Sequence, residues 1–198
     1  MQIKKQAEAL MPTPWGSFTM SAYADSPTDL MPHVALVHES ADRTQAVLTR
    51  IHSECMTGDL FSSKRCDCGE QLERSLELAA EEGGAVIYLR QEGRGIGIIN
   101  KLKAYNLQDE GLNTADANAH LGLPIDSRHY DLAEEILWDL GIKKIRLLTN
   151  NPLKIKAMQA SRIEVTERVP LIIPARKENA FYLKTKSDLM GHLLFPNR

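Results

Sequence analysis

A regular alternation of helical and extended segments, beginning near residue 70, is the feature that most constrains the fold of this chain. Apolar residues recur at helical spacing in some segments and form short strand-like runs in others, with glycine, proline or asparagine between them. The predicted helices cover residues 70–82, 98–108, 130–140 and 153–160, and the predicted strands cover 85–90, 145–148 and 163–169. Alternation of this kind favours an α/β fold with a layered β-sheet and some parallel pairing.

The first fifty residues differ, because they are rich in strand-like segments. Strands are predicted over residues 17–24, 33–38 and 46–51, with a loop over 25–31. A strand-rich start followed by alternating helices and strands indicates a mixed sheet flanked by helices. Since no repeat, low-complexity tract or long linker interrupts residues 1–198, we expect a single domain.

Composition limits the partners of the chain. Its 43% hydrophobic and 25% charged residues are ordinary for a globular fold, and its apolar runs are too short to span a bilayer. The N-terminal segment lacks the apolar core of a secretion signal, so we expect a cytoplasmic protein without a membrane partner. A formal net charge of −2 does not supply the basic surface of a nucleic-acid-binding protein.

All three cysteines lie in one short stretch, at Cys55, Cys66 and Cys68. Three thiolates can hold one soft metal ion and leave a fourth position open, as catalytic zinc sites do. A disulfide would leave one thiol over in a chain without a secretion signal. Two alternatives stay open: the thiols pack as small apolar side chains, or His52 completes a closed structural Cys3His site.

The turn Q-E-G-R-G-I-G links a predicted strand to a predicted helix. Gly93, Gly95 and Gly97 let a ligand approach the backbone, the helix N-terminus favours anions, and Arg94 can bind a phosphate. An ordinary strand-to-helix turn explains the glycines equally well. The dinucleotide-binding motif is excluded, because it would need glycine at position 98, which is Ile98.

The segment R-I-H-S-E-C places Arg50, His52 and Glu54 on alternate positions of a strand, so their side chains should share one face. A cation, an imidazole and a carboxylate beside a metal ligand indicate a binding site. The alternative is a solvated outer face of the sheet. Metal ligation by His52 would require a bend of the chain before Cys55.

Two further turns carry polar side chains. In T-N-N-P-L-K, Thr149 follows a strand and Lys154 lies near the start of the next helix, where anions bind. The alternative there is an ordinary asparagine cap beside a solvated lysine. In P-I-D-S-R-H-Y, Asp126 and Arg128 form either a catalytic pair or a local ion pair that caps the helix over residues 128–140.

Together these segments resemble the GTP cyclohydrolase II family, whose members open riboflavin biosynthesis. The similarity runs in order along nearly the whole chain. The matching stretches are R-I-H-S-E-C (50–55), R-C-D-C-G (65–69), R-Q-E-G-R-G-I-G (90–97), N-K-L-K-A-Y (100–105), D-S-R (126–128), L-L-T-N-N-P-L-K (147–154) and Y-L-K-T-K-S-D-L-M-G-H (182–192). The chain looks like the stand-alone form, since it is too short for the dihydroxybutanone-phosphate synthase domain that often precedes this one.

The resemblance implies a zinc-dependent hydrolase that acts on GTP. Cys55, Cys66 and Cys68 would bind one zinc ion with water in the fourth position, and the resulting hydroxide would attack C8 of guanine. Ring opening, a second hydrolysis that frees formate, and loss of pyrophosphate would give 2,5-diamino-6-hydroxy-4-(5-phosphoribosylamino)pyrimidine. Tyr105 would help to position water or a ring nitrogen near the zinc, unless it is a core aromatic residue at helical spacing.

The resemblance also implies the substrate contacts, a homodimer, and Mg2+ bound with the triphosphate. Asp126 would accept a proton during pyrophosphate release, and Arg128 would act as a nucleophile on the α-phosphate or, more simply, stabilise transition-state charge. Glu92 or Glu54 would pair with the guanine N1–H and amino group. The residues expected to contact GTP are Arg50, Ile51, His52, Ser53, Glu54, Gln71, Glu92, Gly93, Arg94, Thr114, Thr149 and Lys154.

Two other functions stay open from the sequence. One is a nucleotide hydrolase of the same fold that stops at the formamidopyrimidine. The other is a non-catalytic Cys3His zinc module that binds nucleic acid, although it would leave the glycine turn, Lys154 and the Asp126–Arg128 pair unexplained.

Overall fold

The computed structural model describes residues 3–124 and 126–194. The chain forms two compact units, each assembled from separate stretches. Among the described residues, the first unit takes 3–52, 72–90 and 130–171, and the second takes 53–71, 91–124, 126–129 and 172–194. Because the chain passes repeatedly from one unit to the other, no linker marks a boundary in the sequence. The assignment of residues 1–198 to one functional domain stays a prediction.

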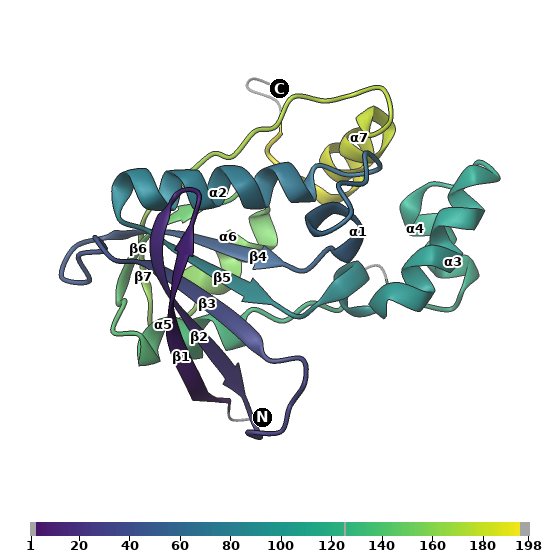
Figure 1. Ribbon diagram of the computed structural model, residues 1–198. Helices are drawn as coiled ribbons and strands as arrows, with labels where there is room; N and C mark the ends of the chain where they lie inside the picture. The colour runs from purple at the N-terminus through teal and green to yellow at the C-terminus, as the bar shows by residue number, and fades with distance from the viewer. Residues whose placement is uncertain (1–2, 125, 195–198) are drawn as a thin grey trace. The chain divides into compact units, whose positions relative to one another are not determined.

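One mixed sheet lies in the first unit, except for the last residue of its fourth strand (Figure 1). Its seven strands are β1 (Lys4–Thr13), β2 (Gly16–Ala24), β3 (His33–His38), β4 (Val47–Ser53), β5 (Ala85–Leu89), β6 (Lys144–Leu148) and β7 (Glu164–Val169), in the spatial order β1-β2-β3-β5-β4-β6-β7. Strands β1, β2, β3 and β5 pair antiparallel, whereas β4, β6 and β7 pair in parallel. The sheet is therefore mixed, as predicted.

Four of the helices confirm predicted ones, and three were not predicted. The confirmed helices are α2 (Cys68–Glu82), α3 (Gly97–Asp109), α5 (Asp131–Asp139) and α6 (Pro152–Gln159). The others are α1 (Met56–Asp59), α4 (Thr114–His120) and α7 (Ala180–Met190), and a 3-10 turn, η1, covers Glu92–Gly95. Within the described part of the chain, no helix has both the length and the apolar character needed to cross a bilayer.

Helix α2 covers one face of the sheet. Phe18 of β2 and Val86 of β5 pack there with Ala79, Leu72 and Leu76 of α2. The helical spacing of these three residues gives α2 one apolar side, and strand alternation sends Val86 toward that side. Figure 1 shows α2 lying along the sheet.

Helices α5 and α6 cover the opposite face. Strand residues that point to this face, such as Ile87 of β5 and Ile145 of β6, are fully buried. They belong to one core cluster with Ile136 and Leu137 of α5 and Met158 of α6. Because both faces of the sheet are covered by helices, the predicted α/β fold with a layered mixed sheet flanked by helices is confirmed.

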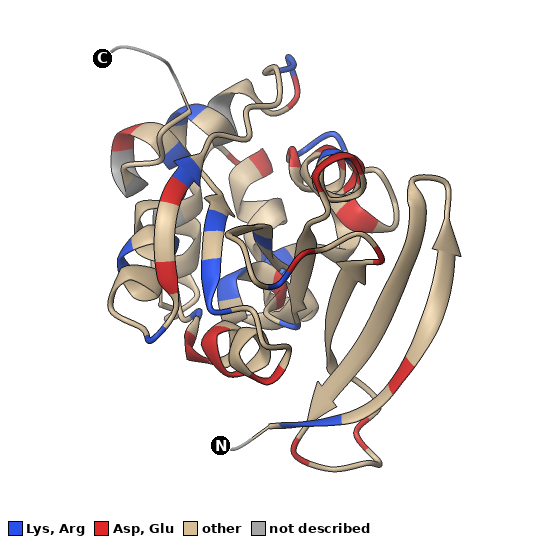
Figure 2. Ribbon diagram, turned by 90° about the vertical axis from the view of Figure 1, so that its left-hand side faces the viewer, with Lys and Arg blue, Asp and Glu red and all other residues tan. Residues whose placement is uncertain are grey.

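Basic residues of β6 lie beside acidic residues of β7, its neighbour in the sheet (Figure 2). Lys144 of β6 pairs with Glu164 of β7 at 3.3 Å, and Arg146 pairs with Glu167 at 2.9 Å. These partners are at least one-third exposed, so such pairs contribute at most about 1 kcal/mol each.

The packing of α5 against the sheet can be tested by Ile136→Ala. Since Ile136 is 0% exposed, its truncation leaves a cavity and should lower the free energy of unfolding by about 2–5 kcal/mol in urea titrations. Leu30, which is 91% exposed, supplies the control, because Leu30→Ala should change stability by less than about 0.5 kcal/mol. Equal effects of the two substitutions would contradict this core.

Candidate active site

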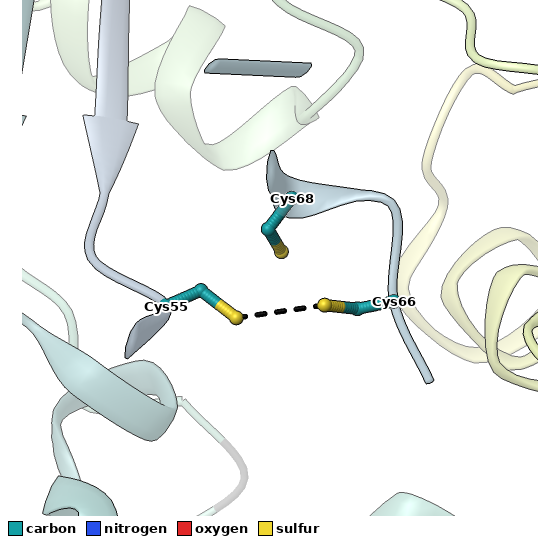
Figure 3. Close-up of side chains that lie close together, drawn as sticks. All are labelled: Cys55, Cys66 and Cys68. Carbon is teal, nitrogen blue, oxygen red and sulfur yellow. Dashed lines mark hydrogen bonds between the residues drawn. The ribbon is translucent and has the colours of Figure 1, made fainter. Parts of the chain in front are cut away.

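The three cysteine sulfurs converge in the second unit (Figure 3). Cys55 precedes α1, Cys66 lies in the following loop, and Cys68 begins α2. Their sulfur atoms all lie within 4.8 Å of one another, and those of Cys55 and Cys66 are 3.5 Å apart. Zinc–sulfur bonds of about 2.3 Å in a tetrahedral site require sulfur separations near 4 Å. The donor set and its spacing therefore fit zinc, and the alternative of incidental thiols loses support.

The metal-ligating group found among the described residues contains these three cysteines and no histidine. Strand β4 includes His52 and ends at Ser53, two residues before Cys55. The imidazole of His52 instead stacks on Tyr88 within the first unit, at 5.5 Å between ring centroids. The closed Cys3His site is therefore not supported.

Two glycines allow the cysteine loop to fold this tightly. A Cβ atom on Gly58 of α1 would lie 2.9 Å from the sulfur of Cys66. A Cβ atom on Gly69 would lie 2.3 Å from the carbonyl oxygen of Gly58. Because neither contact leaves room for a side chain, α1 and the start of α2 approach through bare backbone.

Lys101 of α3 places a positive charge beside the first cysteine. Its Nζ atom, in a residue only 9% exposed, donates to the sulfur of Cys55 at 3.1 Å and to Oε1 of Glu92 at 2.8 Å. Hydrogen bonds from the thiols of Cys66 and Cys68, together with the Lys101 charge, lower the pKa of Cys55 well below that of an ordinary thiol. The nearby ammonium of Lys101 thus favours the thiolate form of Cys55, which is the form that metals bind.

Asp67, between two of the cysteines, is held by a second buried lysine. Lys186 of α7 donates to Oδ1 of Asp67 at 3.0 Å, and the amide of Gln71 donates to Oδ2. Burial alone would raise the pKa of Asp67, but the charge and hydrogen bond of Lys186 lower it. Gln71, a predicted substrate contact, thus also supports the cysteine loop.

Tyr105 lies one helical turn beyond Lys101 on α3. Lys101 Nζ is 5.8 Å from the centre of the Tyr105 ring, and the Arg65 guanidinium carbon is 4.9 Å from it. Arg65 in turn pairs with Asp109 at 2.7 Å. The ring is half-buried between two cations near the cysteine loop, which is unlike a core aromatic residue.

The glycine turn is a structured loop and not a direct strand-to-helix connection. Gly93, Arg94 and Gly95 all have positive φ, at 61°, 63° and 90°, and α3 begins only at Gly97. The backbone amide of Ser127 donates to the carbonyl oxygen of Arg94 at 3.0 Å. The Nη2 atom of Arg94 is buried and has no hydrogen-bond partner among the described residues, so it can donate a hydrogen bond to an anionic ligand.

Asp126 and Arg128 form a partly buried ion pair. Arg128 donates through Nε to Oδ1 of Asp126 at 2.9 Å and through Nη2 to Oδ2 at 2.5 Å. Burial would raise the pKa of Asp126, but the hydrogen bonds and charge of Arg128 lower it, with a further contribution from Arg94. The local ion pair of the second alternative is present, and a catalytic role for the two residues stays a prediction. The role of the pair as a helix cap is wrong, because α5 begins at Asp131 and Tyr130 occupies the N-cap.

In the first unit, Arg50 and His52 share the α2 face of the sheet near the end of β4. Arg50 donates to the carbonyl oxygen of Leu148 at 3.1 Å. The two side chains are only 6% and 2% exposed, so the alternative of a solvated outer face is wrong. Ile51 points to the opposite face and belongs to the core, so it can contact a ligand only through its backbone.

Thr149 and Lys154 lie at the carboxyl ends of the parallel strands. The side chain of Asn151 accepts from the amide of Leu153 at 2.9 Å, which confirms the predicted asparagine cap on α6. Lys154 is not solvated: it is 4% exposed, and its Nζ donates to the carbonyl oxygen of Ile51 at 2.7 Å. In open α/β sheets, ligands bind at such strand ends.

The remaining predicted contacts are dispersed along the second unit. Ser53 ends β4, and its buried hydroxyl has no hydrogen-bond partner among the described residues. Glu54 follows it and is buried, and Thr114 begins α4. Glu92 accepts hydrogen bonds from the amides of Met56 and Gly93 as well as from Lys101. The roles of all these residues stay predictions.

Sequence reasoning missed Lys101 and the pairing of Asp67 with Lys186. The spacing of Lys101 four residues before Tyr105 would have placed both on one face of a helix. No local pattern reveals the second pair, because its members are 119 residues apart.

Comparison with known proteins gives consistent results. A family model described as GTP cyclohydrolase II matches residues 4–170. A GTP cyclohydrolase-2 from Shewanella oneidensis is 51% identical over 195 residues, which cover 98% of this chain and 96% of that protein. A GTP cyclohydrolase-2 from Buchnera aphidicola subsp. Schizaphis graminum is 50% identical over 196 residues, covering 98% and 100%.

Two longer proteins are also similar. The riboflavin biosynthesis protein RibBA of Bacillus mycoides is 50% identical over 193 residues, which cover 97% of this chain and 48% of that protein. A crystal structure of RibBX, a two-domain 3,4-dihydroxy-2-butanone 4-phosphate synthase from A. baumannii, matches 84% of this chain and 40% of its own, with 20% identity and a TM-score of 0.49. The RibBX likeness is too weak to bear on the site. The family model and the near full-length relatives show that this chain belongs to the GTP cyclohydrolase II family of enzymes.

Proposed function

We propose that this protein hydrolyses GTP in the first step of riboflavin biosynthesis. It opens the guanine imidazole ring, releases formate and pyrophosphate, and leaves 2,5-diamino-6-hydroxy-4-(5-phosphoribosylamino)pyrimidine. The observation that carries the proposal is the convergence of Cys55, Cys66 and Cys68 within 4.8 Å in a chain of this family. The alternative of a non-catalytic zinc module is disfavoured, because the chain belongs to a family of enzymes.

The cysteine group would hold one zinc ion per chain. Three protein ligands with an open fourth position are typical of catalytic zinc. When bound, zinc lowers the pKa of a water molecule to about 7, which supplies a nucleophile at neutral pH. The chain itself holds the three sulfurs together and offsets their negative charge with Lys101.

Several residues of the chain would bind GTP. Thr149 and Lys154, at the carboxyl ends of β6 and β4, suit phosphate or ribose oxygens. Arg94 offers a buried guanidinium nitrogen to an anionic group. Glu92 or Glu54 would pair with the guanine N1–H and amino group, and both residues are buried. Mg2+ would accompany the triphosphate, since it takes phosphate oxygens and water as ligands.

Arg128 would stabilise charge at the α-phosphate. Its ion pair with Asp126 favours the protonated guanidinium, which has no lone pair with which to attack phosphorus. A positioned cation of this kind stabilises the charge that develops during displacement of pyrophosphate. Asp126 orients the guanidinium and can accept a proton in the same step.

The first experiment is a combined product and metal assay. Purified protein with GTP and Mg2+ should release both formate and pyrophosphate, with about one zinc per chain in the same sample. Pyrophosphate without formate would indicate an empty or inert zinc site. Release of neither product, with zinc tightly held, would contradict the cyclohydrolase proposal.

The substitution Cys66→Ser tests the three-thiolate site. Loss of one sulfur should reduce both bound zinc and formate release to background, because two thiolates hold zinc poorly. Zinc is quantified by elemental analysis and formate by an enzyme-coupled assay. Lys64→Ala, at an exposed position of the same loop, is the control and should change neither. A Cys66→Ser protein with full metal and full formate release would rule out this ligand set.

The role of Arg128 can be separated from that of zinc. Arg128→Met should slow pyrophosphate release by about 10²–10³-fold without changing zinc content, and Arg128→Lys should recover part of the rate by restoring a positive charge. Mass spectrometry of wild-type protein quenched during turnover should show no nucleotide adduct. An adduct on Arg128 would instead establish the nucleophilic alternative.

We also propose a cytoplasmic homodimer. Reduced thiols persist in the cytoplasm, as a thiolate site requires. Strand β1 is an edge strand whose ten residues are almost all exposed, and exposed edges of this length are normally covered or paired. Light scattering should give twice the mass of one chain at micromolar concentration. The mass of a single chain throughout would refute the dimer.

A further inference from the structure

Lys101 lies among three groups that the proposed function uses. Its Nζ atom is 3.1 Å from the sulfur of Cys55, 2.8 Å from Oε1 of Glu92, and 5.8 Å from the centre of the Tyr105 ring. The ammonium group is buried with these partners, since the side chain is only 11% exposed. All four residues belong to the second unit.

A lysine is an expensive residue to bury, so its position calls for a physical reason. Desolvation of an ammonium group costs several kcal/mol unless an anion or strong acceptor compensates. Glu92 alone could provide that compensation. The second contact, to a thiol sulfur, is the unusual one, because three thiolates around a divalent cation leave one negative charge that a nearby ammonium would offset.

Glu92 connects Lys101 to two other segments through hydrogen bonds. Its Oε2 atom accepts from the amide of Met56, the residue after Cys55, at 2.7 Å. Its Oε1 atom also accepts from the amide of Gly93 in the glycine turn at 2.6 Å. Lys101 therefore holds, directly or through one carboxylate, the first cysteine, the start of α1 and the glycine turn.

We propose that Lys101 is a positioning residue of the metal centre, which fixes the Cys55 sulfur and the Glu92 carboxylate and sets how strongly Cys55 donates to the metal. This inference rests on the proposed zinc site. Partners that contact metal ligands orient them and tune the metal, and their loss typically lowers metal affinity by about 10–100-fold.

The experiment uses the full-length protein and three variants. Lys101→Met removes the charge and the hydrogen-bond donor, whereas Lys101→Gln removes the charge and keeps a donor. Lys103→Met, at an exposed position of the same helix, is the matched control. Zinc affinity is measured by competition with a chromophoric chelator, and the sulfur-to-cobalt charge-transfer band is recorded after Co2+ is substituted for zinc.

Lys101→Met should weaken zinc binding by about 10–100-fold, and Lys101→Gln should weaken it less. A sulfur that loses a positive neighbour donates more readily, so the charge-transfer band should move to longer wavelength in Lys101→Met. Loss of loop stability alone would lower the affinity but leave the band of the bound fraction in place. Lys103→Met should match the wild type in both measurements. If Lys101→Met does not fold, as judged by circular dichroism, Lys101→Gln carries the same comparison.

Failure of this inference and failure of the zinc proposal give different results. Wild-type protein that binds no zinc, or Cys66→Ser protein that binds it fully, would overturn the zinc site and this inference with it. If zinc binds stoichiometrically through the cysteines but the Lys101 variants keep wild-type affinity and band position, only the role of Lys101 is overturned.

Discussion

The fold of the second unit depends on holding three cysteine sulfur atoms within 4.8 Å of one another beside the buried carboxylate of Asp67. Thiolates repel one another, and their burial is costly without positive partners. Lys101 supplies one such partner to Cys55, and Lys186 supplies another to Asp67, which lies between the other two cysteines. These cations come from α3 and α7, 46 and 119 residues away from the groups they contact. The short cysteine loop is thus held by helices that are distant in the sequence.

Much of the sheet could be predicted because its buried strands are rich in apolar residues. Strands β5 and β6 carry buried apolar residues on both faces, and β3 buries Ala35 and Val37 on one face with Leu36 partly buried on the other, so all three appear as short apolar runs. Strand β1 escaped prediction because nearly all of its residues are exposed, so neither face is selected for apolar side chains. The α4 helix is short and has no apolar stripe, which explains why periodicity did not reveal it.

The site was predictable only where its chemistry is concentrated in the sequence. The spacing of Cys55, Cys66 and Cys68 was sufficient to predict a three-thiolate group, because thiols so close in sequence can converge with little chain between them. The partners of those thiols were not predictable, since Lys101 becomes a neighbour of Cys55 only through the packing of α3. The same limit explains the wrong helix cap at Asp126, whose carboxylate is used by Arg128 instead.

Burial decides which interpretation of the remaining polar residues is correct. From the sequence alone, Arg50, His52 and Lys154 could equally have been solvated side chains. A solvated side chain carries no desolvation cost. In the structure they are 6%, 2% and 4% exposed, so each carries a desolvation cost that internal partners must offset. All three lie near the carboxyl ends of parallel strands, where open sheets bind ligands, so their burial is consistent with the proposed contacts to GTP.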